Sequence, residues 1–496
     1  MRKKKLAKNT ICSLAFQITT IICGFILPRL ILNTFGSEVN GLVNSITQFL
    51  QIIAFLELGV GAVVQSSLYK PLAEKDNQKV SQIVVSANKF FKRLAQILLV
   101  YIVILFFIYP YIAKQEFGFL YSGLLILAIS VSSFAQYYFG VVDRLLLTAN
   151  QCGYIQYNAQ TVSLIVNTVA CFALIKFGFS IHVVKLTTSI IFLLRPAFLR
   201  WYVNRHYDIN RKATYDQEPI KQKWNGVAQH VAAVVLDGTD NIVLTVFADL
   251  ASVSIYSVYN IVLAGVKQLL LSMTNGIQAL LGELWAKKEY ENLNKTFGWF
   301  EWAIHIAVIF VFGCTGMLIV PFIQVYTAGV NDAQYTQVLF AALMTMAQAG
   351  HCLRLPYNLM ILAAGHYKQT QSNYIIAAIL NIVISIIAVF NYGLVGVAIG
   401  TLVAMVFQTI WMAVYDSKYL IKWPLRNFFK QVAVDVLTVL VCVAITKCFE
   451  MVSVSFISWI ILAAETAAVW VVIIILINFL FYRKKMTNIL KKIIRR

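Results

Sequence analysis

Long apolar stretches without charge recur along this sequence, and they constrain its fold more than any other feature. A helix needs about 20 apolar residues to cross a bilayer. Charged residues, Pro or Gly mark off fourteen such stretches. They cover residues 9–33, 40–68, 88–112, 118–147, 155–176, 182–203, 226–247, 253–282, 297–322, 335–363, 371–390, 394–415, 429–448 and 455–481. Because they stay apolar throughout instead of alternating over about ten residues, they indicate helices and not barrel strands.

The composition excludes the main soluble classes. Apolar residues make up 60% of the 496 residues and charged residues only 12%, whereas a soluble domain carries about 25% charged residues. A soluble enzyme, a disordered protein and a coiled coil are therefore excluded. The predicted fold class is an all-α integral membrane protein with about 14 transmembrane helices.

The distribution of Lys and Arg predicts the orientation. The net charge is +20, and 34 of the 41 basic residues fall in the termini and in alternate loops when the amino terminus is placed inside. Positive loops lie on the cytoplasmic side, so we expect both termini in the cytoplasm. The charge then contacts anionic lipid headgroups, and no nucleic-acid partner is needed to explain it.

An internal repeat divides the sequence. A shift of 212–213 residues lays Phe35–Ser45 over Phe247–Ser257 and sets Ala73–Asp76 beside Ala286–Glu289. Each repeat holds six spans, so the halves share one orientation, a parallel arrangement found in transporters that bind substrate between the halves. The predicted parts are an N-lobe at 1–205, a cytoplasmic linker at 206–223, a C-lobe at 224–416, two additional spans within 417–482 and a basic cytoplasmic tail at 483–496.

Ionisable residues inside spans are the candidate functional residues, because charge in a membrane is costly and is usually functional. They are Arg29, Glu57, Asp237, Asp240, Lys267 and Arg354. Two of the cations lie beside a proline that can bend a helix, Arg29 after Pro28 and Arg354 two residues before Pro356.

The cations favour an anionic substrate. Facing a cavity, Arg29, Lys267 and Arg354 would suit a phosphate or diphosphate headgroup. Arg29 could instead snorkel to the outer interface, Arg354 could hold helices together in a salt bridge, and Lys267 could pair with Asp237 or Asp240. Glu57, Asp237 and Asp240 could couple transport to protons or cations, or they could form internal pairs or helix-end contacts. For Glu57 the structural role is slightly favoured.

Motifs for energy conversion and catalysis are absent from the sequence. There is no GxxxxGK[ST] loop for ATP and no HExxH among the six histidines. We therefore predict neither an enzyme nor a metal or cofactor site. Transport would draw on a proton or sodium gradient, the membrane potential or consumption of the product.

Several runs resemble the oligosaccharide flippases, or polysaccharide exporters, of bacterial surface-polysaccharide gene clusters. They are Phe35–Val43, Glu57–Gly61, Leu68–Asp76, Asp143–Ala149, Ile255–Tyr259 and Gly276–Glu283. The resemblance covers the whole chain. It implies the multidrug/oligosaccharidyl-lipid/polysaccharide exporter fold, with two six-helix lobes in a V and two further helices at the carboxyl end.

That resemblance also implies a function and a location. The expected activity is translocation of an undecaprenyl-diphosphate-linked oligosaccharide across the bacterial cytoplasmic membrane, with a polysaccharide polymerase and glycosyltransferases as possible partners. Arg29 is the position most similar to the diphosphate-binding arginines of lipid II flippases. Those proteins have more arginines in their first two spans, so a peptidoglycan precursor is not assigned as substrate. A cation-coupled multidrug exporter and a non-transporting scaffold remain the alternatives.

Overall fold

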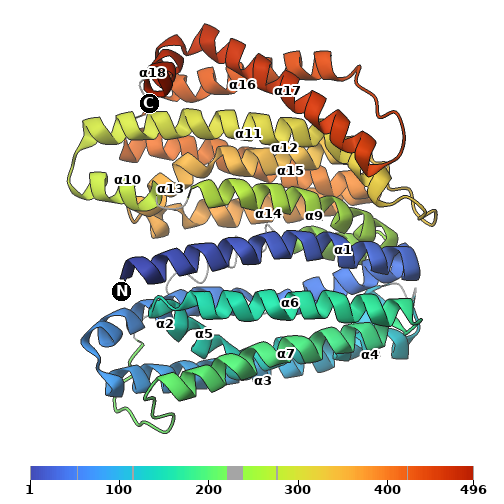
Figure 1. Cartoon of the computed structure of the whole chain (residues 1–496), viewed down its shortest axis with the longest axis vertical. Helices are drawn as coiled ribbons and strands as arrows, with labels where there is room; N and C mark the ends of the chain where they lie inside the picture. The colour runs from blue at the N-terminus through green and yellow to red at the C-terminus, as the bar shows by residue number, and fades with distance from the viewer. Residues whose placement is uncertain are drawn as a thin grey trace. The chain divides into compact units, whose positions relative to one another are not determined.

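The described part of the structure is helical throughout. A computed structural model describes residues 2–52, 54–113, 117–220, 238–274, 277–421 and 423–494, and no strand occurs among them. The all-α prediction is therefore confirmed. The chain divides into two compact units, Met1–Ser257 and Val258–Arg496, which are described separately below (Figure 1).

The first unit is built on long helices around one apolar core. In order they are α1 (Arg2–Gln51), α2 (Ala54–Glu74), α3 (Asn77–Ile112), α4 (Phe119–Ala135), the π-helix η1 (Gln136–Gly140), α5 (Val141–Ala149), α6 (Gly153–Lys176) and α7 (Ile181–His206). Helix α6 packs between α1 and α7, and α4 packs against α3 and α7. A further helical segment occupies 238–247, and α9 (Leu250–Met273) then leads into the second unit.

The second unit follows a similar order and adds helices at its end. It contains α10 (Ile277–Ala286), α11 (Tyr290–Tyr326), α12 (Val338–Leu353), α13 (Leu355–Ala363), α14 (Tyr367–Tyr392), α15 (Leu394–Tyr415), the π-helix η2 (Asp416–Leu420), α16 (Leu425–Thr446), α17 (Phe456–Phe481) and α18 (Arg483–Ile494). The additional spans α16 and α17 pack against each other and against α11.

Twelve helices of the described residues are long and apolar enough to cross a membrane, which makes this a multi-pass membrane protein. The predicted second span is divided between the end of α1 and α2. Most of the predicted seventh span (226–247) lies outside the described residues, which exclude 221–237. Within α1 the backbone leaves helical geometry at Gly36 (φ 84°), eight residues after Pro28.

Backbone conformation supports the internal repeat. Three pairs of residues with positive φ are separated by 213 to 215 positions: Lys75 (57°) with Lys288 (58°), Gln151 (56°) with Gly365 (75°), and Gly178 (78°) with Gly393 (51°). Positive φ is uncommon outside glycine. All three non-glycine residues with positive φ in the described chain belong to these pairs. The same uncommon turns therefore recur at the spacing of the sequence repeat.

The docking of α17 on α11 yields a testable prediction. Trp470 is fully buried, and a Cβ atom at Gly313 would overlap its indole ring. Gly313→Ala should therefore force the two helices apart and cost about 1–3 kcal/mol, the usual penalty of overpacking. Thermal unfolding of the purified protein in detergent measures the loss. Gly265→Ala on α9 is the matched control, since nothing lies within 4 Å of its added methyl group. Equal melting temperatures for the two variants would contradict the packing argument.

Candidate functional site

Arg354 lies at a break between two helices. Helix α12 ends at Leu353 and α13 begins at Leu355, with Pro356 in the first turn of α13. Proline lacks a backbone N–H and its ring clashes with the preceding turn, which favours a kink or a break at this point. Arg354 is the residue between the two helices. The proline in this span thus marks an interruption, as the sequence indicated.

Arg354 is the buried member of a basic cluster that also contains the half-buried residues Lys267 and His351. Only 7% of Arg354 is exposed, and one terminal guanidinium nitrogen lies 3.1 Å from Nδ1 of His351. Because a guanidinium only donates, Nδ1 accepts and the imidazole is neutral with its proton on Nε2. The charges of Lys267, from α9, and of Arg354 both act on His351 and on Cys352. Two of the three candidate cations therefore lie together in the second unit.

The third candidate cation, Arg29, lies in the first unit. It is half-buried on α1, directly after Pro28.

Among the candidate acids, only Asp240 has a described side chain. Asp240 is 2% exposed and accepts a hydrogen bond from the Tyr256 hydroxyl at 3.0 Å. That bond joins the 238–247 segment to α9. Asp237 lies outside the described residues, and Glu57 lies on α2 with its side chain outside the described part.

A buried polar network in the second unit escaped the sequence analysis. Glu301 on α11 accepts hydrogen bonds from the Tyr357 hydroxyl and, at 3.2 Å, from Trp423 Nε1. One turn later His305 pairs with Asp435 on α16 at 2.5 Å. Glu301 and His305 are four residues apart inside a predicted span, and Asp435 lies inside another. His305 was recognised as a histidine within a span, and a complete search of the spans for Asp and Glu would also have found Glu301 and Asp435.

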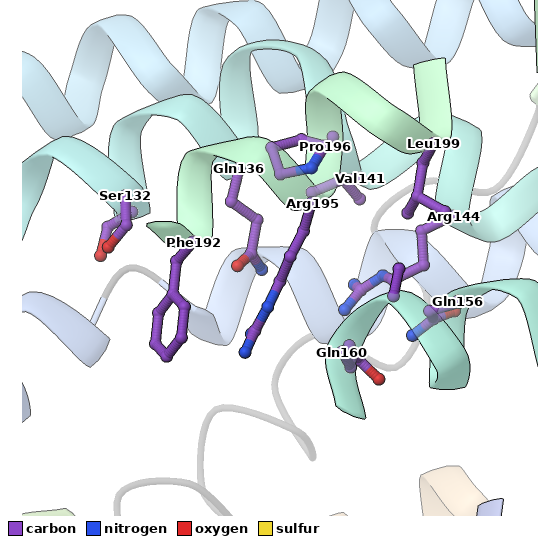
Figure 2. Close-up of a pocket in the computed structure, with 13 residues that line it drawn as sticks. Ser132, Gln136, Val141, Arg144, Gln156, Gln160, Phe192, Arg195, Pro196 and Leu199 are labelled. Carbon is purple, nitrogen blue, oxygen red and sulfur yellow. The ribbon is translucent and has the colours of Figure 1, made fainter. Parts of the chain in front are cut away.

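A pocket with two arginines in the first unit was also missed. Its lining includes Arg195, Arg144, Gln136 and Gln160, which Figure 2 shows extending from separate helices toward one space. Arg195 lies inside α7, which continues beyond it to His206. The overlooked signal is its neighbour Pro196, since an arginine close to a proline also marked Arg29 and Arg354.

Helix α18 docks on α11 through one lysine. The basic tail forms a short helix from Arg483, and Lys485 Nζ donates to the Gly298 carbonyl at 2.7 Å. The ammonium also lies 5.4 Å from the ring centre of Trp302 and 5.8 Å from that of Trp299. Burial lowers the pKa of Lys485 to about 8.

The shifted pKa of Lys485 predicts a pH dependence of stability. Between the folded pKa of about 8 and the ordinary value of about 10.4, the unfolded chain binds more protons. Stability should therefore rise with pH through that window and stay level below it, where Lys485 is charged in both states. Lys485→Met should lose this rise, whereas Lys484→Met on the exposed side of α18 should keep it. Melting temperatures at pH 7 and pH 9 test the difference, and an identical pH response in all three proteins would refute it.

Comparison with known proteins defines the fold. No protein-family model and no curated protein sequence matches the chain. Among solved structures, the lipid II flippase MurJ in an inward closed conformation is similar with a TM-score of 0.74 at 15% identity, covering 96% of this chain and 100% of that chain. An inward-facing multidrug resistance transporter of the MATE family gives a TM-score of 0.65 at 14% identity, covering 82% and 98%. A MOP superfamily transporter from Pyrococcus furiosus gives 0.61 at 13% identity, covering 84% and 96%. The chain has the fold that these flippase and exporter structures share.

Proposed function

We propose that this protein is a flippase that moves an undecaprenyl-diphosphate-linked oligosaccharide from the inner to the outer leaflet of a bacterial cytoplasmic membrane by alternating access. The observation that carries the proposal is the cluster of Lys267, Arg354 and His351 at a helix break, in which Arg354 is buried. Cations inside a membrane domain are costly and are candidates for a functional site. The fold supports a transporter, since similar structures include a lipid II flippase.

The headgroup chemistry follows from the residue types. A guanidinium binds phosphate oxygens through two parallel hydrogen bonds, and an ammonium adds a compact charge. The neutral His351 ring accepts from Arg354, which fixes the direction of the guanidinium. In the proposal Arg354 and Lys267 bind the diphosphate, and Arg29 is a further candidate for contact with the substrate. No cofactor is needed.

The energy source and the partners form part of the same proposal. Asp240, together with Asp237 and Glu57, would couple transport to a proton or sodium gradient. Both termini would lie in the cytoplasm, and the polymerase and glycosyltransferases of the polysaccharide pathway would act on either side of the transport step.

Transport in purified vesicles is the decisive experiment. The full chain is reconstituted with a fluorescent undecaprenyl-diphosphate oligosaccharide, and a membrane-impermeant glycosidase then reports which leaflet holds the sugar. We expect protein-dependent exchange between leaflets that empty vesicles lack. Equal accessibility with and without protein would reject the flippase and favour a scaffold role.

A multidrug exporter is the second candidate, because the fold is also that of MATE transporters. Uptake of a fluorescent organic cation by the same vesicles, with no oligosaccharide movement, would support this alternative instead.

A further inference from the structure

The pocket in the first unit is a polar cavity inside a helical bundle. It has a volume of about 110 Å³, far more than the roughly 10–15 Å³ that one water molecule requires. Its thirteen lining residues come from α4, η1, α5, α6 and α7. It therefore lies wholly within the unit, separate from the Lys267 and Arg354 cluster.

The lining of this pocket is cationic and rich in hydrogen-bond donors. Arg195 and Arg144 supply two guanidinium groups, and Gln136, Gln156 and Gln160 supply amides. Among the thirteen lining residues of the described chain there is no Asp or Glu. Asp143, the acid next to Arg144 in sequence, forms an ion pair with Arg211 at 2.8 Å. The pocket is therefore complementary to an anion.

Two contacts hold Arg195 in place, and they use only one of its N–H donors. Its Nε donates to the Ser163 hydroxyl on α6 at 2.6 Å, and its guanidinium stacks on the Phe192 ring with 3.8 Å to the ring centre. A guanidinium has five N–H donors, and the Ser163 bond uses one of them. An oriented guanidinium of this kind suits a phosphate group.

An apolar groove adjoins the polar pocket. It lies along α6 and α7, has a volume of about 530 Å³ and shares Arg195 and Ala159 with the pocket. Most of its lining is aliphatic or aromatic, and Val162, Leu194 and Phe198 are exposed there. A polar anion site that opens into an exposed apolar groove matches a molecule with an anionic head and a hydrocarbon chain.

The depth of the pocket matches a lipid phosphate. Helix α5 ends at Ala149 and α6 begins at Gly153, so Gln156 lies about 5 Å into α6 at 1.5 Å per residue. This is the end that the Lys and Arg distribution assigns to the cytoplasm. In that orientation, we expect the headgroups of the inner leaflet near this end of the bundle.

We propose that the pocket and groove together bind one anionic phospholipid of the inner leaflet. The phosphate lies between Arg195 and Arg144, and an acyl chain follows the groove between α6 and α7. This site goes beyond the proposed transport function, and its occupant is a resident membrane lipid and not the transported substrate.

Native mass spectrometry of the full-length protein tests the lipid site. The delipidated protein is titrated with phosphatidylglycerol, and phosphatidylcholine serves as the zwitterionic reference. We expect one tightly bound phosphatidylglycerol per chain. Arg195→Gln and Arg144→Gln should each weaken its binding by about tenfold or more, the value of a hydrogen bond to a charged group. Val166→Trp should also weaken it, because the indole would occupy the groove that Val166 lines.

Arg205→Gln is the matched control, since Arg205 is an exposed arginine on the same helix outside the pocket. It should bind phosphatidylglycerol like the unmodified chain. Equal binding by all variants, or equal affinity for phosphatidylcholine, would overturn the proposal. Competition by inorganic phosphate at the lipid's own affinity would show a simple anion site and would also overturn it. Displacement only by a lipid-linked oligosaccharide, with no phosphatidylglycerol binding, would reassign the pocket to the substrate.

Discussion

Arg354→Gln is expected to lower the rate of lipid-linked oligosaccharide translocation by about tenfold to a hundredfold, the range for losing a hydrogen bond to a charged group in a buried site. Arg354 is 7% exposed and lies beside His351. The charges of Arg354 and Lys267 both act on that histidine. The vesicle assay measures the rate, and the amount of reconstituted protein is matched for each variant. Glutamine keeps part of the volume and removes the charge.

Two further variants make the test specific. Arg354→Lys keeps the charge but loses the planar guanidinium that can form two parallel hydrogen bonds, so it should retain an intermediate translocation rate. Arg426→Gln removes an exposed arginine of the same unit and should transport normally. If Arg354→Gln transports at the normal rate, the cluster does not bind the diphosphate, and Arg354 serves the packing of α12 and α13.

The second large effect is a loss of stability, expected when the pair formed by His305 and Asp435 is broken. Both side chains are buried between α11 and α16. Asp435→Leu should destabilise the protein by about 3–5 kcal/mol, the usual cost of removing one partner from a buried pair. The Gln431 amide, which donates to Asp435 at 3.1 Å, would lose its acceptor as well. Unfolding of the purified protein in mixed micelles with sodium dodecyl sulfate measures the change.

The double variant separates pairing from packing. His305→Leu combined with Asp435→Leu replaces both polar groups by apolar ones, which often costs little. We therefore expect the double variant to be more stable than Asp435→Leu alone. Additive losses from the two single variants would show that the pair contributes no coupling energy.

The sequence predicted the helical membrane fold and part of the candidate site, for identifiable reasons. Apolar length marks a span without any knowledge of its neighbours, so most spans were recovered. Arg354 and Lys267 were found because isolated charges stand out within apolar stretches, and Pro356 correctly indicated a helix interruption. The contact of His351 with Arg354 follows from helical spacing, since the two are three residues apart, whereas the approach of Lys267 could not be predicted, because α9 and α12 are far apart in sequence.

The residues that were missed lie where span boundaries are ambiguous. Arg195 was grouped with the charges that follow it, although α7 continues to His206. Glu301 lies near the start of a span, where a carboxylate is normally solvated, and only the packing of Tyr357 and Trp423 against it shows that it is buried. Burial depends on neighbouring helices, which one span's hydropathy does not describe.

The paired positive-φ turns bear on the history of the chain. A left-handed lysine costs about 1–2 kcal/mol relative to its usual conformation, and Lys75 and Lys288 both adopt it at corresponding positions. Gln151 and Gly365 keep the equivalent turn although their side chains differ. A conformation that recurs in both halves at the repeat spacing is the pattern expected if one six-helix unit that already had these turns was duplicated.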